Sequence, residues 1–148
     1  MDKQTFYGIG FKNDLGGYEI RTPNFKTSSS PKGITSIDNG TNTVAVFEGF
    51  MDFLSFKAMN KQLPENSLNF VILNSVSFFE KARVFMETHH SIQLYFDRDE
   101  TGLSYTKRAL SLSTKYTDES KLYHKYKDLN DWAMNCGKSE KRKLRQKL

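Results

Sequence analysis

The hydrophobic pattern divides the chain into an N-terminal part with short strands and a longer part in which strands and helices alternate. Residues 5–37 contain the alternating or aromatic segments TFYGIGF, GYEIRT and GITSI, and turn-rich sequences separate them. Short segments bounded by Gly, Asn, Ser and Pro are typical of antiparallel strands. We therefore expect a small antiparallel β unit over residues 1–40.

From residue 41 the pattern predicts an α/β domain. The apolar runs TNTVAVFEG, LNFVILN, SIQLYF and SKLYHKY predict four strands. The segments FMDFLSFKAMNK, FFEKARVFMETHH, LSYTKRALSLSTKY and LNDWAMNCG have helical spacing, and Gly137 would end the last helix. Alternation of this kind is typical of a largely parallel sheet flanked by helices, which we assign to residues 41–137.

Two of these helices have a predicted buried face. The apolar positions of the first predicted helix are Phe50, Phe53, Leu54 and Met59, and those of the second are Phe78, Ala82 and Phe85. Their spacing of three and four residues is that of an amphipathic helix, so we expect them to face the sheet.

Composition limits the functional classes. The 148 residues are 37% hydrophobic and 14% aromatic, enough for one folded core. No apolar run approaches the ~18 residues of a membrane span, and the first residues do not resemble a signal peptide, so we expect a cytoplasmic protein without a membrane partner. Cys136 is the single cysteine and cannot form an internal disulfide, and three histidines without a CxxC motif give no recognisable zinc site.

The net charge of +5 is concentrated at the C-terminus. Residues 138–148, KSEKRKLRQKL, contain six of the 22 basic residues and one of the 17 acidic ones, so residues 1–137 balance at 16 and 16. A terminal basic cluster suits contacts with phosphates, but charge runs also occur as solvated helix ends or linkers. We treat residues 138–148 as a basic tail or linker.

Carboxylates follow the predicted strands at the ends where open α/β sheets bind ligands. The five residues at these positions are Glu48, Asp52, Asp97, Asp99 and Asp128. Asp97 and Asp99 lie two residues apart, so their side chains point the same way from an extended backbone and can hold one ion. Like charges this close need a cation, and an oxygen-rich set suits Mg²⁺ or Mn²⁺. The pattern predicts a divalent-metal site.

Two acidic segments resemble the Toprim domain, the metal-binding catalytic module of DnaG-type primases, type IA and type II topoisomerases and some nucleases. VAVFEGFMD, followed some fifty residues later by LYFDRDETG, is similar to the family pattern of a strand ending in Glu-Gly and a later strand ending in Asp-x-Asp. The forms EGFMD, DRDETG and YKDLND most resemble the primase branch. The resemblance covers residues 40–137 well and 5–37 only loosely, where FKTSSSP is weakly similar to a primase segment.

The resemblance implies a Toprim-like fold and divalent-metal-dependent nucleotidyl transfer, which in the primase branch is RNA primer synthesis on single-stranded DNA from nucleoside triphosphates. A replicative helicase is a further candidate partner. The implied metal ligands are Glu48, Asp52, Asp97, Asp99 and Asp128, of which Glu48, Asp97 and Asp99 would be catalytic. The implied phosphate or nucleic-acid contacts are Lys26, Arg21, Lys127 and Arg98, although Arg98 could instead pair with Glu100. Gly49 and Gly102 would be structural turn residues.

The third acidic segment departs from the family pattern. It reads Asp128-Leu-Asn130-Asp131, so the second family aspartate is replaced by Asn130 or has moved to Asp131. A DnaG-type primase also has a zinc-binding module and a helicase-contacting domain, and neither fits in this chain. We therefore expect a fragment of a longer protein or a compact relative from a mobile element or phage.

Three other functions remain open at this point. A haloacid-dehalogenase-like phosphatase has a DxDxT motif that YFDRDET matches, but that family places the motif on its first strand and needs more than the 49 residues that follow Asp99. A Toprim nuclease or topoisomerase fragment would contain the same acidic segments. A non-catalytic module could bind nucleic acid or a replication partner through the basic tail.

Overall fold

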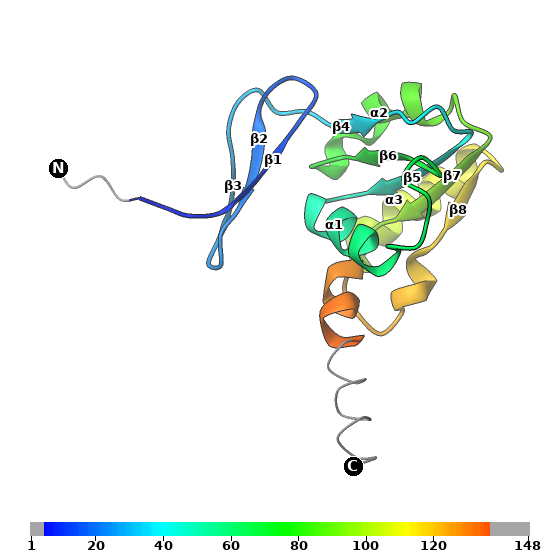
Figure 1. Cartoon of the computed structure of the whole chain (residues 1–148). Helices are drawn as coiled ribbons and strands as arrows, with labels where there is room; N and C mark the ends of the chain where they lie inside the picture. Colours follow the sequence, from blue (N-terminus) through cyan, green and yellow to red (C-terminus); the bar gives the residue numbers. More distant parts are fainter. Residues whose placement is uncertain (1–4, 137–148) are drawn as a thin grey trace, which may run out of the picture.

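The computed structural model describes residues 5–136, which form a small antiparallel sheet beside a larger mixed sheet (Figure 1). The small sheet has the order β1-β2-β3, with strands β1 (Ile9–Lys12), β2 (Tyr18–Arg21) and β3 (Lys26–Ser28). The larger sheet has the order β4-β6-β5-β7-β8, with strands β4 (Thr35–Ile37), β5 (Thr43–Phe47), β6 (Asn69–Ile72), β7 (Ser91–Tyr95) and β8 (Tyr116–Asp118).

Helices connect and cover the strands of the larger sheet. They are α1 (Phe50–Met59), α2 (Phe79–Met86), α3 (Glu100–Leu112), the 3-10 helices η1 (Val76–Phe78) and η2 (Ser120–Tyr123), and helical residues 129–136. Strand β5 pairs in parallel with β6 and β7, and β7 pairs in parallel with β8, whereas β4 runs antiparallel to β6. The expected α/β fold, a largely parallel sheet flanked by helices and preceded by a small antiparallel β unit, is confirmed.

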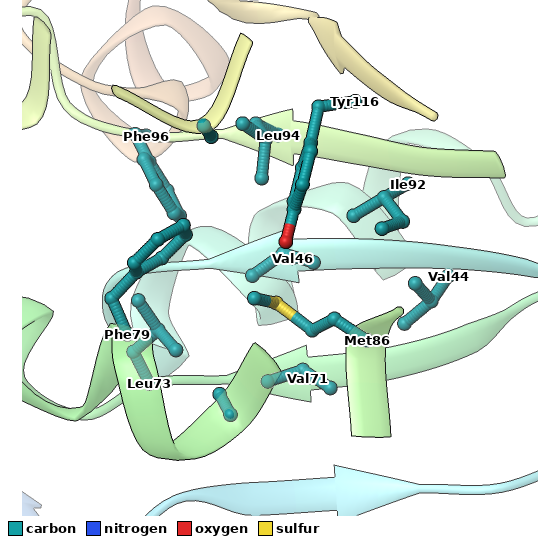
Figure 2. Packing of buried hydrophobic residues seen from close by; sticks show 12 residues of the cluster. Val44, Val46, Val71, Leu73, Phe79, Met86, Ile92, Leu94, Phe96 and Tyr116 are labelled. Atoms are coloured by element: carbon teal, nitrogen blue, oxygen red, sulfur yellow. The ribbon is translucent and has the colours of Figure 1, made fainter. Parts of the chain in front are cut away.

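The central strands are hydrophobic on both faces because helices cover both. In β5, Val44 and Val46 belong to one core cluster and Ala45 and Phe47 to the other, since successive side chains of a strand alternate between faces. Figure 2 shows the first cluster, in which residues of α2 and α3 pack on the sheet. Residues of α1 and of the helix at 129–136 pack on the opposite face. This arrangement explains why the strands read as continuous apolar runs.

The predicted fourth strand is wrong. Residues 120–126 do not form a strand: Ser120–Tyr123 is a 3-10 helix, and the strand is β8, which begins at Tyr116, the last residue of the segment predicted as a helix. The apolar positions of this segment arise because Tyr123 and Tyr126 pack on the second core cluster, and Tyr123 Oη donates a hydrogen bond to the Phe96 carbonyl at 2.7 Å. Short apolar runs fit a strand or a tight helical turn equally well.

Three smaller expectations also differ from the structure. GITSI was expected in the small unit, but its strand β4 pairs with β6 of the larger sheet. Helix α1 exposes Leu54 and buries Phe56, and α2 buries Phe79 and Met86, so each buried face is rotated from the predicted one. The direction from which the sheet contacts a helix selects the buried face, and apolar spacing alone leaves several choices. Gly137 and residues 138–148 lie outside the described residues.

Aromatic stacking joins the small sheet to the larger domain. The ring of Phe11 in β1 stacks on Phe50 of α1 with centroids 5.2 Å apart and an interplanar angle of 6°. It also lies 5.8 Å from Phe53. This contact holds the small sheet over the start of α1, where β5 ends. Across residues 5–136, none of the helices combines the length and hydrophobicity needed to cross a membrane.

Candidate functional site

A cavity of about 580 Å³ lies between the small sheet and the carboxyl ends of β5, β6 and β7. Its wall contains the carboxylates Glu19, Glu48, Asp52, Asp97, Asp99 and Asp128 and the cations Arg21, Lys26 and Lys127. All five predicted acidic residues thus reach one cavity. Six acidic groups against three basic ones, counted over the described residues, make its wall suitable for a cation.

Glu48 and Asp97 form the centre of the site because their strands end side by side. In the parallel pairing of β5 with β7, Phe47 lies opposite Tyr95, so the residues that follow each strand are neighbours. The Asp97 backbone N–H donates a hydrogen bond to Glu48 Oε2 at 3.0 Å. Burial, and then the interaction with the Asp97 carboxyl group, raises the pKa of Glu48 to about 8. The pair therefore tends to hold a proton at neutral pH.

Asp97 itself lacks a full set of partners. Burial raises the pKa of its carboxyl group, and its Oδ1 atom is buried without a hydrogen-bond partner among the described residues. A buried carboxylate oxygen without a donor is unfavourable, and a cation can satisfy it.

Asp52 is the most buried of the predicted ligands, with 6% of its surface exposed. Helix α1 places it in its first turn, where its Oδ1 accepts a hydrogen bond from the Asn130 backbone N–H at 2.9 Å. Burial, and then the charge of Asp128, raises the pKa of Asp52 to about 7. Asp52 thus joins α1 to the start of the last described helix.

Asp99 and Asp128 lie at helix starts. Asp99 caps α3, because its Oδ1 accepts a hydrogen bond from the Gly102 N–H at 2.8 Å. Asp128 Oδ1 accepts one from the Asp131 N–H at 2.8 Å. Each of these aspartates thus accepts a hydrogen bond at a helix start and also lines the cavity wall.

The two predicted turn glycines differ. A Cβ on Gly102 would lie 2.8 Å from the carbonyl carbon of Asp97 and closer still to its oxygen, so α3 can pack against Asp97 only through a glycine. Gly102 is therefore required for close packing inside a helix, and not for a bend ahead of it. Gly49 has an extended backbone (φ −132°) and open space where a Cβ would lie, so neither conformation nor packing requires a glycine there.

The predicted basic residues separate into two groups. Arg21 and Lys26 are cross-strand neighbours in the small sheet, and both line the cavity, as does Lys127. Arg98 does not belong to the cavity wall: its Nη1 donates a hydrogen bond to Ser120 Oγ at 2.9 Å. It therefore adopts neither of the two arrangements considered for it, the pair with Glu100 or a phosphate contact in the cavity.

Arg98 instead anchors the loop that carries Lys127. Its backbone N–H donates a hydrogen bond to the Lys127 carbonyl at 2.6 Å, and its side chain bonds to the fully buried Ser120. Together with the bond from Tyr123 to Phe96, these contacts fix both ends of the segment against the strand end of β7.

Asn74 and Glu19 are cavity residues that the sequence did not indicate. Asn74 follows β6 in a left-handed conformation (φ 64°), which asparagine adopts more readily than most residues. Its Nδ2 donates to the Gly33 carbonyl at 2.9 Å and so joins β6 to the start of β4. The strand-end rule used for the acidic residues would have selected Asn74 had it been applied to β6.

In the third acidic segment, the structure distinguishes Asn130 from Asp131. Asn130 lines the cavity, and its Oδ1 accepts a hydrogen bond from Ser55 Oγ at 2.9 Å, whereas the exposed Asp131 is outside the cavity wall. Of the two alternatives for the second family aspartate, Asn130 occupies the cavity position.

The donor set fits a divalent cation, although it is not a completed ligand shell. No group of three or more His, Cys, Asp or Glu side chains within residues 5–136 is arranged closely enough to hold an ion as it stands. Glu48 and Asp97 nevertheless interact directly, Asp99 lines the same wall, and Asp97 Oδ1 finds no donor in the part of the chain that the structure describes. All are oxygen donors, which Mg²⁺ and Mn²⁺ prefer.

An acidic cavity at the carboxyl ends of a parallel sheet, built on Glu-Gly and Asp-x-Asp segments, defines a Toprim fold. Residues 45–133, more than half of the chain, match the family described as Toprim-like, and the chain belongs to this family. Residues 1–30 match a domain of unknown function (DUF8464). None of the curated proteins matches the chain.

Two solved structures share the fold. The crystal structure of the primase fragment of the bacteriophage T7 primase-helicase protein matches with a TM-score of 0.63 and 16% identity, over 90% of this chain and 59% of that chain. A structure of the bacteriophage T7 lagging-strand DNA polymerase with primase domains of two gp4 subunits, bound to an RNA/DNA hybrid and dTTP, matches with a TM-score of 0.59 and 18% identity, over 90% and 73%. The chain thus spans less than two thirds of the T7 primase fragment. The expected Toprim domain of primase-like fold is confirmed.

Proposed function

We propose that this chain is the catalytic part of a divalent-metal-dependent nucleotidyltransferase of the DNA primase type, which joins nucleoside triphosphates into RNA on single-stranded DNA. The observation that carries the proposal is the pairing of Glu48 with Asp97 at the adjacent ends of β5 and β7. This acidic pair faces a cavity whose other wall presents Arg21 and Lys26. Such a site can hold a cation and a triphosphate together.

The residues have separable roles in this proposal. Glu48, Asp97 and Asp99 would hold Mg²⁺ or Mn²⁺, and Asp52 and Asp128 would bind a second ion or its water shell. When bound, the metal neutralises the charge of the triphosphate and of the leaving pyrophosphate. As an alternative to holding the metal, Glu48 would act as the general base that accepts the proton of the attacking 3′-hydroxyl.

The cations would bind the phosphates of the substrate. Lys26 and Arg21 reach the cavity from the small sheet, and Lys127 reaches it from the loop before the last described helix. We therefore propose that the domain at residues 41–137 needs the N-terminal sheet to complete its substrate site. A helicase remains a candidate partner, because the matched T7 fragment comes from a primase-helicase protein.

Two observations favour primase chemistry over the other candidate functions. The matched T7 domains are primase domains, and one of the two structures is a complex with a DNA polymerase that also contains an RNA/DNA hybrid and dTTP. The family match spans both acidic segments, EGFMD and DRDETG, which a phosphatase reading leaves unconnected. A Toprim nuclease would share the metal site, so the reaction product distinguishes the two enzymes.

The test is RNA synthesis by the purified chain on single-stranded DNA oligonucleotides with labelled nucleoside triphosphates and Mn²⁺. We expect short RNA products from the wild type, none from Asp97→Asn, and full activity from Asp131→Asn, the same substitution on an exposed residue outside the cavity. Cleavage of the DNA without RNA synthesis would assign a nuclease. A folded protein that binds no Mn²⁺ in calorimetry would assign a non-catalytic module.

A further inference from the structure

Phe6 and Phe25 are exposed and in contact at one edge of the small sheet, and we call this pair, with the exposed Tyr7 that follows Phe6 in the sequence, the aromatic edge. Phe6 is 63% exposed, Tyr7 85% and Phe25 39%. The rings of Phe6 and Phe25 contact each other edge to face, with centroids 5.2 Å apart. Single exposed aromatics are common, but a contiguous group of them indicates an interaction surface.

The position of Phe25 is fixed by a hydrogen-bonded turn. The Thr22 N–H donates to the Phe25 carbonyl at 2.9 Å, and the buried Thr22 Oγ1 accepts from the Asn24 and Phe25 N–H groups at 3.2 and 3.0 Å. Such a turn holds its side chains in one place, so Phe25 is presented to solvent by the backbone around it.

The position of Phe6 depends on a glycine. A Cβ on Gly8 would lie 2.7 Å from the Arg21 carbonyl oxygen and 3.2 Å from Thr22 Cγ2. Only a glycine lets the segment before β1 cross so closely over the end of β2, and this crossing brings Phe6 onto Phe25. Two independent local features therefore build the exposed pair.

The aromatic edge lies next to two cations of the cavity wall along the chain. Lys26 follows Phe25 directly, and its cross-strand neighbour Arg21 lies at the other end of the same turn; both line the cavity. Residues 21–26 contain these two cations and no acidic residue. A ligand that covers the rings would therefore meet positive charge on its way to the carboxylates.

We infer that the aromatic edge binds the bases of single-stranded nucleic acid whose phosphates contact Arg21 and Lys26 on the way into the cavity, an inference that rests on the proposed function. Bases stack on exposed aromatic rings, and basic side chains beside them track the backbone, which is how single strands are held without sequence preference. A second copy of the chain is a poorer occupant, because a symmetric contact would bring Arg21 and Lys26 of both copies together.

The experiment compares two labelled oligonucleotides of about 12 units, oligo(dT) and an abasic strand with the same phosphates, by fluorescence anisotropy in EDTA. We expect the wild type to bind oligo(dT) at least about five-fold more tightly than the abasic strand. Phe25→Leu and Phe6→Leu should remove this preference, whereas Phe25→Trp should keep it. Val84→Ala, which truncates an 81% exposed residue of α2, is the control.

A second measurement separates rings from charges. Arg21→Gln or Lys26→Gln should lower the salt dependence of binding by roughly 0.7 per lost phosphate contact, and the Phe→Leu variants should leave that slope unchanged. Oligo(U) in place of oligo(dT) shows whether the strand is RNA or DNA.

Equal affinity of the wild type for oligo(dT) and the abasic strand would overturn the inference. So would a dimer in sedimentation velocity that Phe25→Leu dissociates, if the wild type shows no base-dependent binding. Because binding is measured without metal, Asp97→Asn should retain it, so a wild type that binds bases but makes no RNA would refute the proposed function and leave this inference standing.

Discussion

Carboxylates occur in two contrasting settings in this molecule. On the outer surface of α2 and α3, Glu80 and Glu87 form ion pairs with Arg83, and Glu80 also pairs with Arg108. The hydrogen bonds from Arg83 lower the pKa of both glutamates. In the cavity, burial raises the pKa of Glu48 to about 8 and that of Asp52 to about 7.

The difference separates residues that serve the fold from residues that serve a site. Each surface glutamate has a cation within hydrogen-bonding distance and is satisfied without a ligand, and exposed pairs of this kind contribute little to stability. The cavity carboxylates are buried beside one another, which destabilises the folded chain unless a proton or a cation is bound. Groups with raised pKa values that converge in a cavity are typical of functional sites.

The largest expected effect compares the same substitution in the two settings. Glu48→Gln should weaken Mn²⁺ binding by more than about 100-fold, since even residues that only support a metal ligand account for about 10- to 100-fold. The amide can still accept the hydrogen bond from the Asp97 N–H, so the fold should persist. Glu87→Gln should leave the affinity unchanged. Calorimetric titration of both variants checks this, and equal losses would remove the contrast between the two settings.

The second effect is the dependence of stability on pH and metal. The folded pKa values of Glu48 and Asp52 lie above their ordinary values. At a pH between the ordinary and the raised pKa values, the folded metal-free chain therefore holds more protons than the unfolded chain. The contribution of these two groups to the stability of the folded chain is fully present below about pH 4. It is lost as the pH rises through about 7 and 8. The lowered pKa values of Glu80 and Glu87 act in the opposite sense, with stability lost as pH falls.

Mn²⁺ should therefore stabilise the chain most above neutral pH. At a hundredfold excess over Kd the gain is about 2.7 kcal/mol, and it should nearly vanish near about pH 4, where the ligands are protonated. Thermal unfolding with EDTA or Mn²⁺ across this range measures it. A metal-induced rise in Tm of equal size at both ends of the range would contradict a site made of these carboxylates.

The third effect concerns the two glycines beside the acidic segments. Gly102→Ala should destabilise the chain by about 1–3 kcal/mol, because the new methyl group collides with the Asp97 backbone and pushes α3 away. Gly49→Ala has open space and an ordinary backbone conformation, so its free energy of unfolding should change by less than about 0.5 kcal/mol. Urea unfolding of both variants measures this difference. Similar free energies of unfolding for the two would show that α3 can move without cost.

The smallest effect distinguishes two arginines. Arg98→Ala removes the side-chain hydrogen bond to the fully buried Ser120 and should cost about 1–2 kcal/mol. Nucleotide binding should weaken slightly, because the start of the loop that carries Lys127 loses this anchor while the backbone hydrogen bond to the Lys127 carbonyl remains. Arg108→Ala removes an exposed pair with Glu80 and should cost less than about 1 kcal/mol without a change in nucleotide binding. Unfolding and nucleotide titrations of both variants test this, and unchanged nucleotide binding in Arg98→Ala would limit Arg98 to the fold.

The parallel α/β core and the acidic segments could be predicted from the sequence because they depend on local signals. Strands β5, β6 and β7 are continuous apolar runs, and the carboxylates follow them immediately. Strand β8 could not be predicted: it has three residues, and the neighbouring apolar positions pack as a 3-10 helix. The pairing of β4 with β6 also depends on a contact across more than thirty residues of sequence.

The directions of the side chains in the site could not be predicted from the sequence, because they depend on tertiary contacts. Arg98 lies between two cavity aspartates in sequence, yet its partner is Ser120, which the return of the chain after β8 brings alongside. Asn130 and Asp131 were equivalent in the sequence, and the packing of the last described helix on α1 selects Asn130 for the cavity wall.

The sequence by itself determined which residues carry charge at the strand ends, since strand periodicity and chain order are local properties. The tertiary structure decided which of those charges meet one another and which cations face them, because tertiary contacts such as the stacking of Phe11 on Phe50 hold the small sheet at the cavity. It also decided their protonation, because burial dominates the raised pKa values of Glu48 and Asp52, and burial depends on the whole fold.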